Sequence, residues 1–282
     1  MKKIFALLMT FALIFATGCG SQGGEKNSAN DETLKLGTIK YLNVTETLLD
    51  NYFEKASSRM SQTSSMRTPK HIFFDNMTSM LAALQAGQID ALSTYESVGN
   101  YLTAQNSSVE LMTKGVPKVS DSFCCAMLEE NSALKKEFDD AILKLTADGT
   151  LKKLAEEYID NANYNDLPAV EMPHFDNAPT IKVAVTGDLP PLDFVRADGK
   201  PAGFNTAVLS AISQLVGKNF ELVDIDSGAR AAALTSKLVD VVFWVAVPSD
   251  ETFAPANFDK SDGVIVTEPY FTDEIVHVQT KK

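Results

Sequence analysis

The chain has 282 residues, of which 45% are hydrophobic and 22% are charged, and its formal net charge is −12 at pH 7. This length is enough for one large or two small hydrophobic cores. An acidic chain with a pI of about 4.7 lacks the basic surface that nucleic-acid recognition needs, so we expect no nucleic-acid partner.

The first 18 residues have the pattern of a secretory signal peptide. Lys2 and Lys3 form a short basic segment, residues 4–15 are apolar apart from one threonine, and small residues lead up to position 18. The apolar segment is too short to span a bilayer in the mature protein. We therefore expect a signal peptide over residues 1–18.

Cys19 directly follows these small residues, and the arrangement resembles the lipobox of bacterial lipoproteins, although Ala16 stands where leucine is usual. The resemblance implies that Cys19 is lipidated. In an ordinary signal peptide cut nearby, this cysteine would be incidental. Residues 19–32 contain Gly, Ser, Asn and charged residues, which is typical of a flexible tether. We expect a chain anchored by lipid on the extracytoplasmic side of the cell membrane.

Strand-like apolar runs and helix-like segments alternate after residue 32. The expected strands here are 34–41, 71–74 and 89–93, and the expected helices are 44–60 and 77–86. Gly87 follows the second helix as its C-cap. Such βαβ alternation predicts a sheet rich in parallel strands.

A further strand and two helices precede a proline-containing linker over residues 161–180, and a second α/β stretch begins after this linker. The expected strands are 123–128, 181–186, 220–224, 239–245 and 274–279, and the expected helices are 132–147, 150–159, 206–216 and 229–237. Cys124 and Cys125 lie in an apolar run, which predicts strand packing rather than a disulfide or a metal site. The order of elements favours an α/β fold of two similar lobes over one sheet.

Four segments resemble type 2 periplasmic binding proteins, and specifically the extracellular solute-binding family 3 that serves ABC importers. Asp188–Phe194, with the Gly203–Asn205 turn after it, is similar to the opening of that family's first lobe, and Thr267–Phe271 to the segment before its crossing strand. Leu84–Ala91 is similar to a second-lobe segment, and Phe123–Ile159 to the closing strand and helices.

This resemblance implies a monomeric solute-binding lipoprotein that captures a small polar molecule by lobe closure and delivers it to an ABC permease. The expected ligand is amino-acid-like or another small metabolite. We expect no enzymatic activity, no cofactor and no metal. Two alternatives stay open, namely an enzyme on the same fold, such as a dehydratase similar to chorismate dehydratase, and a lobe pair that senses a ligand for a membrane receptor.

The segments occur in an unusual order, because the first-lobe opening follows the closing helices. We interpret this order as a circular permutation, which compact domains tolerate when their natural ends lie close together. A fusion of two partial modules is the alternative. Permutation predicts one lobe over 33–116 and another over 117–282, with a single covalent hinge crossing near Lys114–Ser120. It also predicts that both chain ends pair as hinge strands.

The residues by which family members grip an amino acid are missing. The family's carboxylate-binding Arg and ammonium-binding Asp correspond to Glu251 and Tyr95 here, so we do not expect a free α-amino acid held in the usual way.

The candidate cleft is instead aromatic and polar. Trp244 and Tyr95 are expected to face each other across the ligand, with Phe243 beside Trp244. Candidates for polar contacts are Glu96, Asp188, Asn43 and Thr45, with Asp193, Lys40 and Tyr41 as weaker ones. Glu96 could balance a cationic group, and Asn43 and Thr45 could present N–H groups to an anionic one.

Each candidate also has a structural explanation. Trp244 could belong to the core, Glu96 could be an exposed carboxylate at a helix start, and Asn43 or Thr45 an ordinary N-cap. Asp188 and Asp193 are more typical of solvated loop acids. The three histidines, His71, His174 and His277, fall in a strand, the linker and the last strand, where we expect them to be packed or solvated.

Overall fold

The computed structural model describes residues 33–58, 67–113, 117, 119–249 and 258–281, all of which belong to one unit, Glu32–Lys282. The signal peptide, Cys19 and the tether lie outside the described residues. None of the described helices has the length and apolar content needed to cross a membrane.

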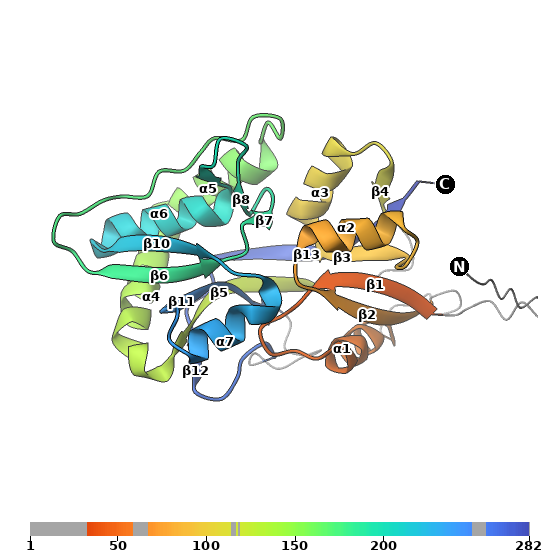
Figure 1. Cartoon of the computed structure of the whole chain (residues 1–282), viewed down its shortest axis with the longest axis horizontal. Helices are drawn as coiled ribbons and strands as arrows, with labels where there is room; N and C mark the ends of the chain where they lie inside the picture. The colour runs from red at the N-terminus through yellow and green to blue at the C-terminus, as the bar shows by residue number, and fades with distance from the viewer. Residues whose placement is uncertain (1–32, 59–66, 114–116, 118, 250–257, 282) are drawn as a thin grey trace, which may run out of the picture. The chain divides into compact units, whose positions relative to one another are not determined.

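The N-terminal half of the described chain alternates strands and helices, as its pattern predicts. Its elements are β1 (Thr33–Ile39), α1 (Glu46–Ser58), β2 (Thr68–Phe74), α2 (Met77–Gln85), β3 (Ala91–Tyr95), α3 (Glu96–Gln105) and β4 (Val109–Leu111). β1 pairs in parallel with both β2 and β3. α1 and α2 cross over between these strands and lie on opposite faces of them (Figure 1).

The helix α3 was not among the helices expected from the sequence. A glycine in the middle of this segment, Gly99, lowers its helix propensity. Its role is a close approach, because a Cβ atom at Gly99 would lie 2.8 Å from Cγ2 of Val276 on the neighbouring strand. Tertiary packing, rather than local propensity, therefore decides this helix.

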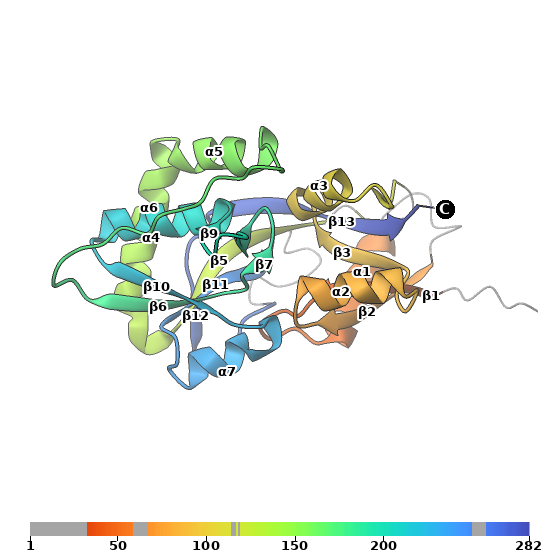
Figure 2. The same ribbon diagram turned by 45° about the horizontal axis from the view of Figure 1, so that its top comes forward.

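The C-terminal half contains a second set of strands and helices. Its elements are β5 (Ser120–Leu128), the 3₁₀ turn η2 (Glu129–Asn131), α4 (Ser132–Ala147), α5 (Thr150–Ala155), the π-helical turn η3 (Glu156–Asp160), β6 (Thr180–Val185), β7 (Asp188–Leu189), β8 (Asp193–Val195), β9 (Pro201–Ala202), α6 (Phe204–Val216), β10 (Asn219–Asp224), η4 (Ser227–Ala229), α7 (Arg230–Thr235), β11 (Val241–Pro248) and β12 (Val264–Val266). Figure 2 shows α5 and α6 on the opposite side of this half from α7. The linker over 161–180 contains no helix.

One long strand, β13 (Phe271–Thr280), joins the two halves. The strand order is β10-β6-β11-β5-β13-β3-β1-β2, with β12 beside β5 and β4 beside β13. Phe271 to Glu274 pair with β5, whereas Ile275 to Val278 pair with β3. The α/β class is confirmed, and β5 and β13 form the joint between the halves.

Two details of the predicted hinge are wrong. The chain also passes between the halves along β13, because β13 is long enough to pair in both halves, while the predicted crossing near Lys114–Ser120 lies partly outside the described residues. The C-terminal end pairs as a hinge strand, as predicted. Residues 33–36 do not, because β1 pairs with β2 and β3, and Leu92 of β3 lies between Gly37 and Val278.

The hydrophobic core is continuous across the joint. Buried residues of the same cluster come from both halves, including Leu49 and Phe53 of α1, Phe123 of β5 and Phe204 of α6. Cys124 and Cys125 are buried in β5 and unbridged, as the apolar run predicted.

Candidate functional site

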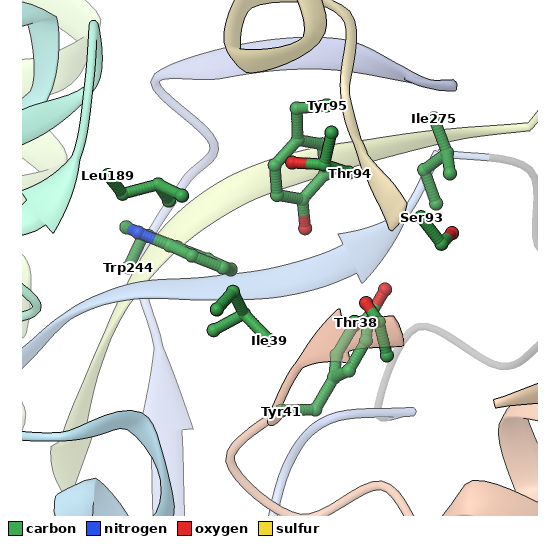
Figure 3. A pocket seen from close by; sticks show the side chains of 9 residues that line it. All are labelled: Thr38, Ile39, Tyr41, Ser93, Thr94, Tyr95, Leu189, Trp244 and Ile275. Atoms are coloured by element: carbon green, nitrogen blue, oxygen red, sulfur yellow. The ribbon is translucent and has the colours of Figure 1, made fainter. Parts of the chain in front are cut away.

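A narrow pocket of about 20 Å³, which has room for about one water molecule, lies where the two halves meet, next to the ends of β1 and β3. Both halves contribute to its lining (Figure 3), which consists of Thr38, Ile39, Tyr41, Ser93, Thr94, Tyr95, Leu189, Trp244 and Ile275. Carboxyl ends of strands in α/β sheets are the usual place for ligands, because loops and helix starts converge there. All nine lining side chains are uncharged at neutral pH, and five carry hydroxyl groups.

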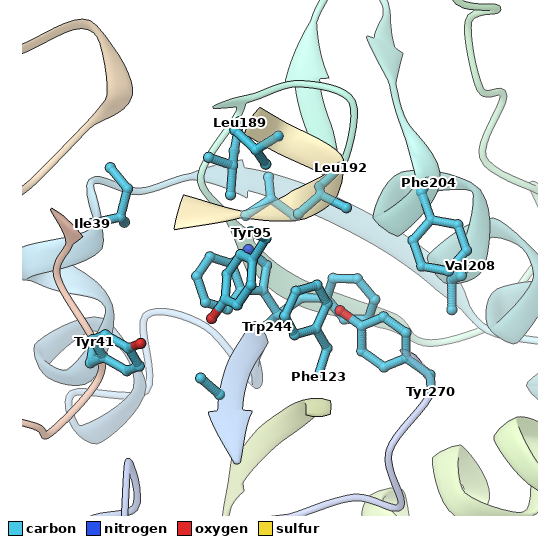
Figure 4. Close-up of a cluster of buried hydrophobic side chains, with 14 of the residues drawn as sticks. Ile39, Tyr41, Tyr95, Phe123, Leu189, Leu192, Phe204, Val208, Trp244 and Tyr270 are labelled. Atoms are coloured by element: carbon cyan, nitrogen blue, oxygen red, sulfur yellow. The ribbon is translucent and has the colours of Figure 1, made fainter. Parts of the chain in front are cut away.

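Trp244 forms one wall of this pocket and is held by the core (Figure 4). Its ring is stacked on Phe123 with centroids 5.4 Å apart, and the guanidinium carbon of Arg230 lies 5.0 Å from the ring centroid. Nε1 is buried and has no hydrogen-bond partner among the described residues. In Figure 3 this nitrogen lies on the side of Leu189.

Tyr95 touches Trp244 directly. The two rings meet edge to face with centroids 5.5 Å apart and an interplanar angle of 85°. The prediction that they face each other across the ligand is therefore wrong for this arrangement, because edge-to-face contact leaves no room between the rings. Both residues still line the pocket, so a ligand would lie beside this pair.

A buried carboxylate supports the two pocket tyrosines. Tyr41 and Tyr95 of the N-terminal half both donate a hydrogen bond to Oδ2 of Asp121 on β5, over 3.3 and 3.2 Å. Burial raises the pKa of the Asp121 carboxyl to about 7, although the two tyrosine hydrogen bonds act in the opposite direction. Asp121 thus positions two lining side chains and joins the halves.

A second buried carboxylate, Asp259, lies in front of α1. Its Oδ1 accepts hydrogen bonds from the backbone N–H groups of Asn43, over 2.7 Å, and of Val44, over 3.3 Å. The N–H of Leu42 interacts with it as well. Burial raises the pKa of this carboxyl to about 6, while these N–H groups and Arg230 favour its charged form.

Arg230 connects β11, the strand that contains Trp244, to the N-terminal half by hydrogen bonds. Its guanidinium is fully buried and donates to the carbonyl oxygens of Trp244, over 2.7 Å, and of Lys40, over 2.9 Å. Burial lowers the pKa of Arg230, while Asp259 raises it. The guanidinium is thus occupied by backbone carbonyls and the indole ring.

Carboxylates of the C-terminal half and of β13 also meet the other two helices of the N-terminal half. Asp188 accepts from the N–H of Met77 over 2.7 Å, and Asp273 from the N–H of Ser97 over 3.2 Å. These positions are the first turns of α2 and α3, where the helix dipole favours negative charge. Together with Asp259 before α1, they hold the two halves against each other.

The other candidates have structural roles here. Phe243 is buried outside the pocket lining and stacks on Tyr270 with centroids 4.9 Å apart. Glu96 is exposed at the start of α3. Thr45 accepts a hydrogen bond from the N–H of Leu48, as an N-cap does. Asp193 is not solvated, as was expected, but is buried, and it accepts from the N–H groups of Thr186 and Gly187 and from the side chain of Asn205.

None of the three histidines lines the pocket. His71 is buried, and its Nδ1 lies 2.7 Å from Oδ1 of Asp50. His277 is buried as well, and burial lowers its pKa to about 4. His174 is exposed in the linker. These positions agree with the packed or solvated roles that were expected.

Several lining residues were not among those expected from the sequence. They are Thr38, Ile39, Ser93, Thr94, Leu189 and Ile275. Hydroxyl residues at the ends of predicted strands were an available signal for three of them. No local signal pointed to Asp259, because it lies 216 residues from Asn43 in the sequence.

Residues 181–280 match the model of the bacterial extracellular solute-binding proteins, family 3. This segment carries the signature of that family. It runs from β6 to the end of β13 and includes Leu189, Trp244 and Ile275 of the pocket, while the N-terminal half supplies the remaining lining. The resemblance stated from the sequence is thereby confirmed at the level of a solute-binding family. No curated protein matches the sequence.

Several solved structures are similar to the chain at low identity. The ligand-binding component of an ABC-type import system from Staphylococcus aureus, solved with zinc bound, has a TM-score of 0.45 and 12% identity over 88% of this chain and 66% of that one. The periplasmic aliphatic sulphonate binding protein SsuA from Escherichia coli has a TM-score of 0.39 and 14% identity over 89% and 62%. The chain thus spans about two thirds or less of the length of these two proteins.

A third similar structure is the ancestral amino acid-binding protein AncCDT-1, a precursor of cyclohexadienyl dehydratase. Its TM-score is 0.42, with 13% identity over 90% of this chain and 84% of that one. The family resemblance therefore rests on residues 181–280 and not on these distant likenesses.

Proposed function

We propose that the chain is an extracytoplasmic solute-binding lipoprotein that captures a small molecule in the pocket between its halves and delivers it to an ABC permease. The observation that carries this proposal is the pocket itself, which both halves line and which adjoins the family 3 segment. Closure of two halves around a small ligand is a common way to bury it from water. Lipid attachment at Cys19 is part of the proposal and rests on the sequence pattern alone.

The chemistry of the lining supports binding. Hydroxyl groups, aromatic rings and aliphatic side chains surround the space, and these groups fix a ligand by shape and a few hydrogen bonds. One observation favours an enzyme as a second candidate, because Asp121, with a pKa of about 7, lies one hydrogen bond behind Tyr41 and Tyr95. The two candidates differ in the fate of the solute, which a binding protein returns unchanged.

Trp244 makes the proposal directly testable, because it is the single tryptophan of the chain and lines the pocket. Its fluorescence, excited at 295 nm, should change on addition of the correct member of a library of amino acids, sulfonates, nucleosides and small aromatic compounds, and should saturate at one ligand per chain. Mass spectrometry of the released solute then shows whether it was altered.

Ser93→Leu should abolish this response by filling the pocket, since Ser93 is a lining residue. Thr235→Leu adds comparable volume on an exposed part of α7 and serves as the matched control. A response that Ser93→Leu leaves intact would place the binding site elsewhere.

We also propose that the lobe order is a circular permutation, with the two lobes over residues 33–116 and 117–282. Its support is that β1 and β13 both pair with β3, so a short linker from 280 to 33 could rejoin them. A chain that starts at residue 180, runs through this linker and ends at residue 160 should fold cooperatively and give the same Trp244 response. A chain of this order that fails to fold would favour the fusion of partial modules.

A further inference from the structure

The backbone N–H groups in front of α1 are arranged to hold an anion. Two consecutive N–H groups, of Asn43 and Val44, point at one carboxylate oxygen, and a helix of 13 residues begins at Glu46. Such a cluster of N–H groups with a helix start behind it attracts negative charge. The structure fills this position with the protein's own Asp259.

Asp259 is deeply inserted rather than resting at the surface. The residue is 2% exposed, and its second carboxylate oxygen, Oδ2, is buried without a hydrogen-bond partner among the described residues. Asn43 adds a side-chain hydrogen bond to the carbonyl oxygen of Lys260, next to Asp259. The carboxylate therefore occupies the N–H groups of Asn43 and Val44 in front of α1.

This carboxylate adjoins the pocket through Tyr41. The Tyr41 ring lines the pocket and meets the ring of Phe258, the residue before Asp259, edge to face at 6.4 Å. On its other side, the Tyr41 hydroxyl donates to Asp121. Asp259 is not itself a lining residue, and its link to the pocket runs through Phe258 and Tyr41.

Among the described residues, the pocket lining contains no cationic side chain that could pair with a carboxylate. Arg230 is bonded to the carbonyl oxygens of Trp244 and Lys40, and every lining side chain is uncharged. Transfer of an unpaired carboxylate from water into such a place is strongly unfavourable. An anionic ligand would have to displace Asp259 to find its N–H donors.

We propose that Asp259 is a built-in carboxylate that occupies the anion position in front of α1 and thereby restricts the pocket to small ligands without a carboxylate group. This inference rests on the proposed solute-binding function and names the ligand class for the same site. It assigns to Asp259 a role in specificity that is separate from contact with the ligand.

Chemical rescue tests whether the position in front of α1 is an anion site. Asp259→Ala removes the carboxylate and leaves a space that formate matches in size and charge. We expect 100 mM sodium formate to raise the melting temperature of Asp259→Ala by about 3 °C above the value in 100 mM sodium chloride, for a Kd of about 10 mM. Formate should leave the wild-type protein unchanged, because the position is occupied.

Two further variants serve as controls. Asp176→Ala removes a carboxylate that is 93% exposed, and formate should not affect it. Asp259→Asn keeps an oxygen that accepts from the N–H groups, and so should fold without formate and show no rescue. If Asp259→Ala is unfolded in sodium chloride, the proposal is supported when the variant folds in sodium formate and not in sodium chloride. The absence of any formate-specific effect on Asp259→Ala, whether folded or unfolded, overturns it.

Benzoate and benzamide, which share size and shape, test specificity through Trp244 fluorescence. Benzoate should bind Asp259→Ala at least tenfold more tightly than the wild-type protein, while the affinity for benzamide should change by less than threefold. Equal benzoate affinity in both proteins overturns the inference. Formate rescue without a response to any solute would refute only the proposed function, whereas a carboxylate solute that binds the wild-type pocket would refute only the inference.

Discussion

Asp121 should make the folded protein less stable as the pH rises, whereas an acid whose pKa is lowered on folding has the opposite effect. Replacement by asparagine should remove this pH dependence. Asp121→Asn removes the charge and keeps an oxygen that accepts from Tyr41 and Tyr95. Burial raises the pKa of the carboxyl from 3.8 to about 7 in the folded protein. The folded state therefore binds this proton more tightly than the unfolded state does.

The magnitude follows from the difference between the two pKa values. Each pH unit corresponds to about 1.4 kcal/mol, so the rise makes the ionised carboxylate less favourable in the folded protein by about 4 kcal/mol. The contribution of protonated Asp121 to the free energy of unfolding is fully present below pH 3.8 and is lost as the pH rises through 7. Between pH 4 and 7, the wild-type protein should lose about 3 kcal/mol of unfolding free energy relative to Asp121→Asn.

Urea unfolding followed by Trp244 fluorescence measures this difference, because Trp244 is buried in the folded protein. The comparison between variants cancels the contributions of groups that do not interact with Asp121, whereas Asp259 and Asp273, whose pKa values burial raises to about 6, interact electrostatically with it. Asp176→Asn, at an exposed site, should follow the wild-type profile. A difference between Asp121→Asn and wild type that stays constant from pH 4 to 8 would refute the reasoning.

Two further predictions concern the backbone and a buried base. Gly203→Ala should lower the free energy of unfolding by more than about 3 kcal/mol, because φ is +107° and the new Cβ would lie 2.3 Å from the carbonyl oxygen of Leu192. The control is Gly199→Ala, where φ is +79° and the space is open, so the loss should be about 1 kcal/mol. Urea denaturation of both variants checks the difference. Burial lowers the pKa of His277 from 6.5 to about 4, so the folded protein favours the neutral imidazole. The contribution of this group to the free energy of unfolding is fully present above pH 6.5, and about 3 kcal/mol of it is lost as the pH falls to 4. His277→Gln should lack this loss in unfolding titrations, and parallel curves for the two proteins would contradict it.

The sequence predicted the secondary structure and the fold class well, for local reasons. Apolar runs with the period of buried strands gave β6 and β10, and amphipathic spacing gave α4 with its bounds Ser132–Ala147. The short β7–β9 sheet was not predicted, because strands of two or three residues carry no periodicity. Trp244 and Tyr95, which were expected in the cleft as aromatic residues at strand ends, both line the pocket, and their role in ligand binding stays a prediction.

What the sequence by itself determined about this protein is its class, its alternation of elements, its resemblance to a solute-binding family and an exported N-terminus as an expectation. Only the tertiary structure decided which groups meet at the pocket. Asp259 and Asn43 are 216 positions apart, and Asp121 and Tyr41 are 80 apart, so no local pattern links them. The physical reason is that helix starts and carboxylates satisfy each other across the joint of the two halves, and such pairing depends on how the chain packs rather than on neighbours in sequence.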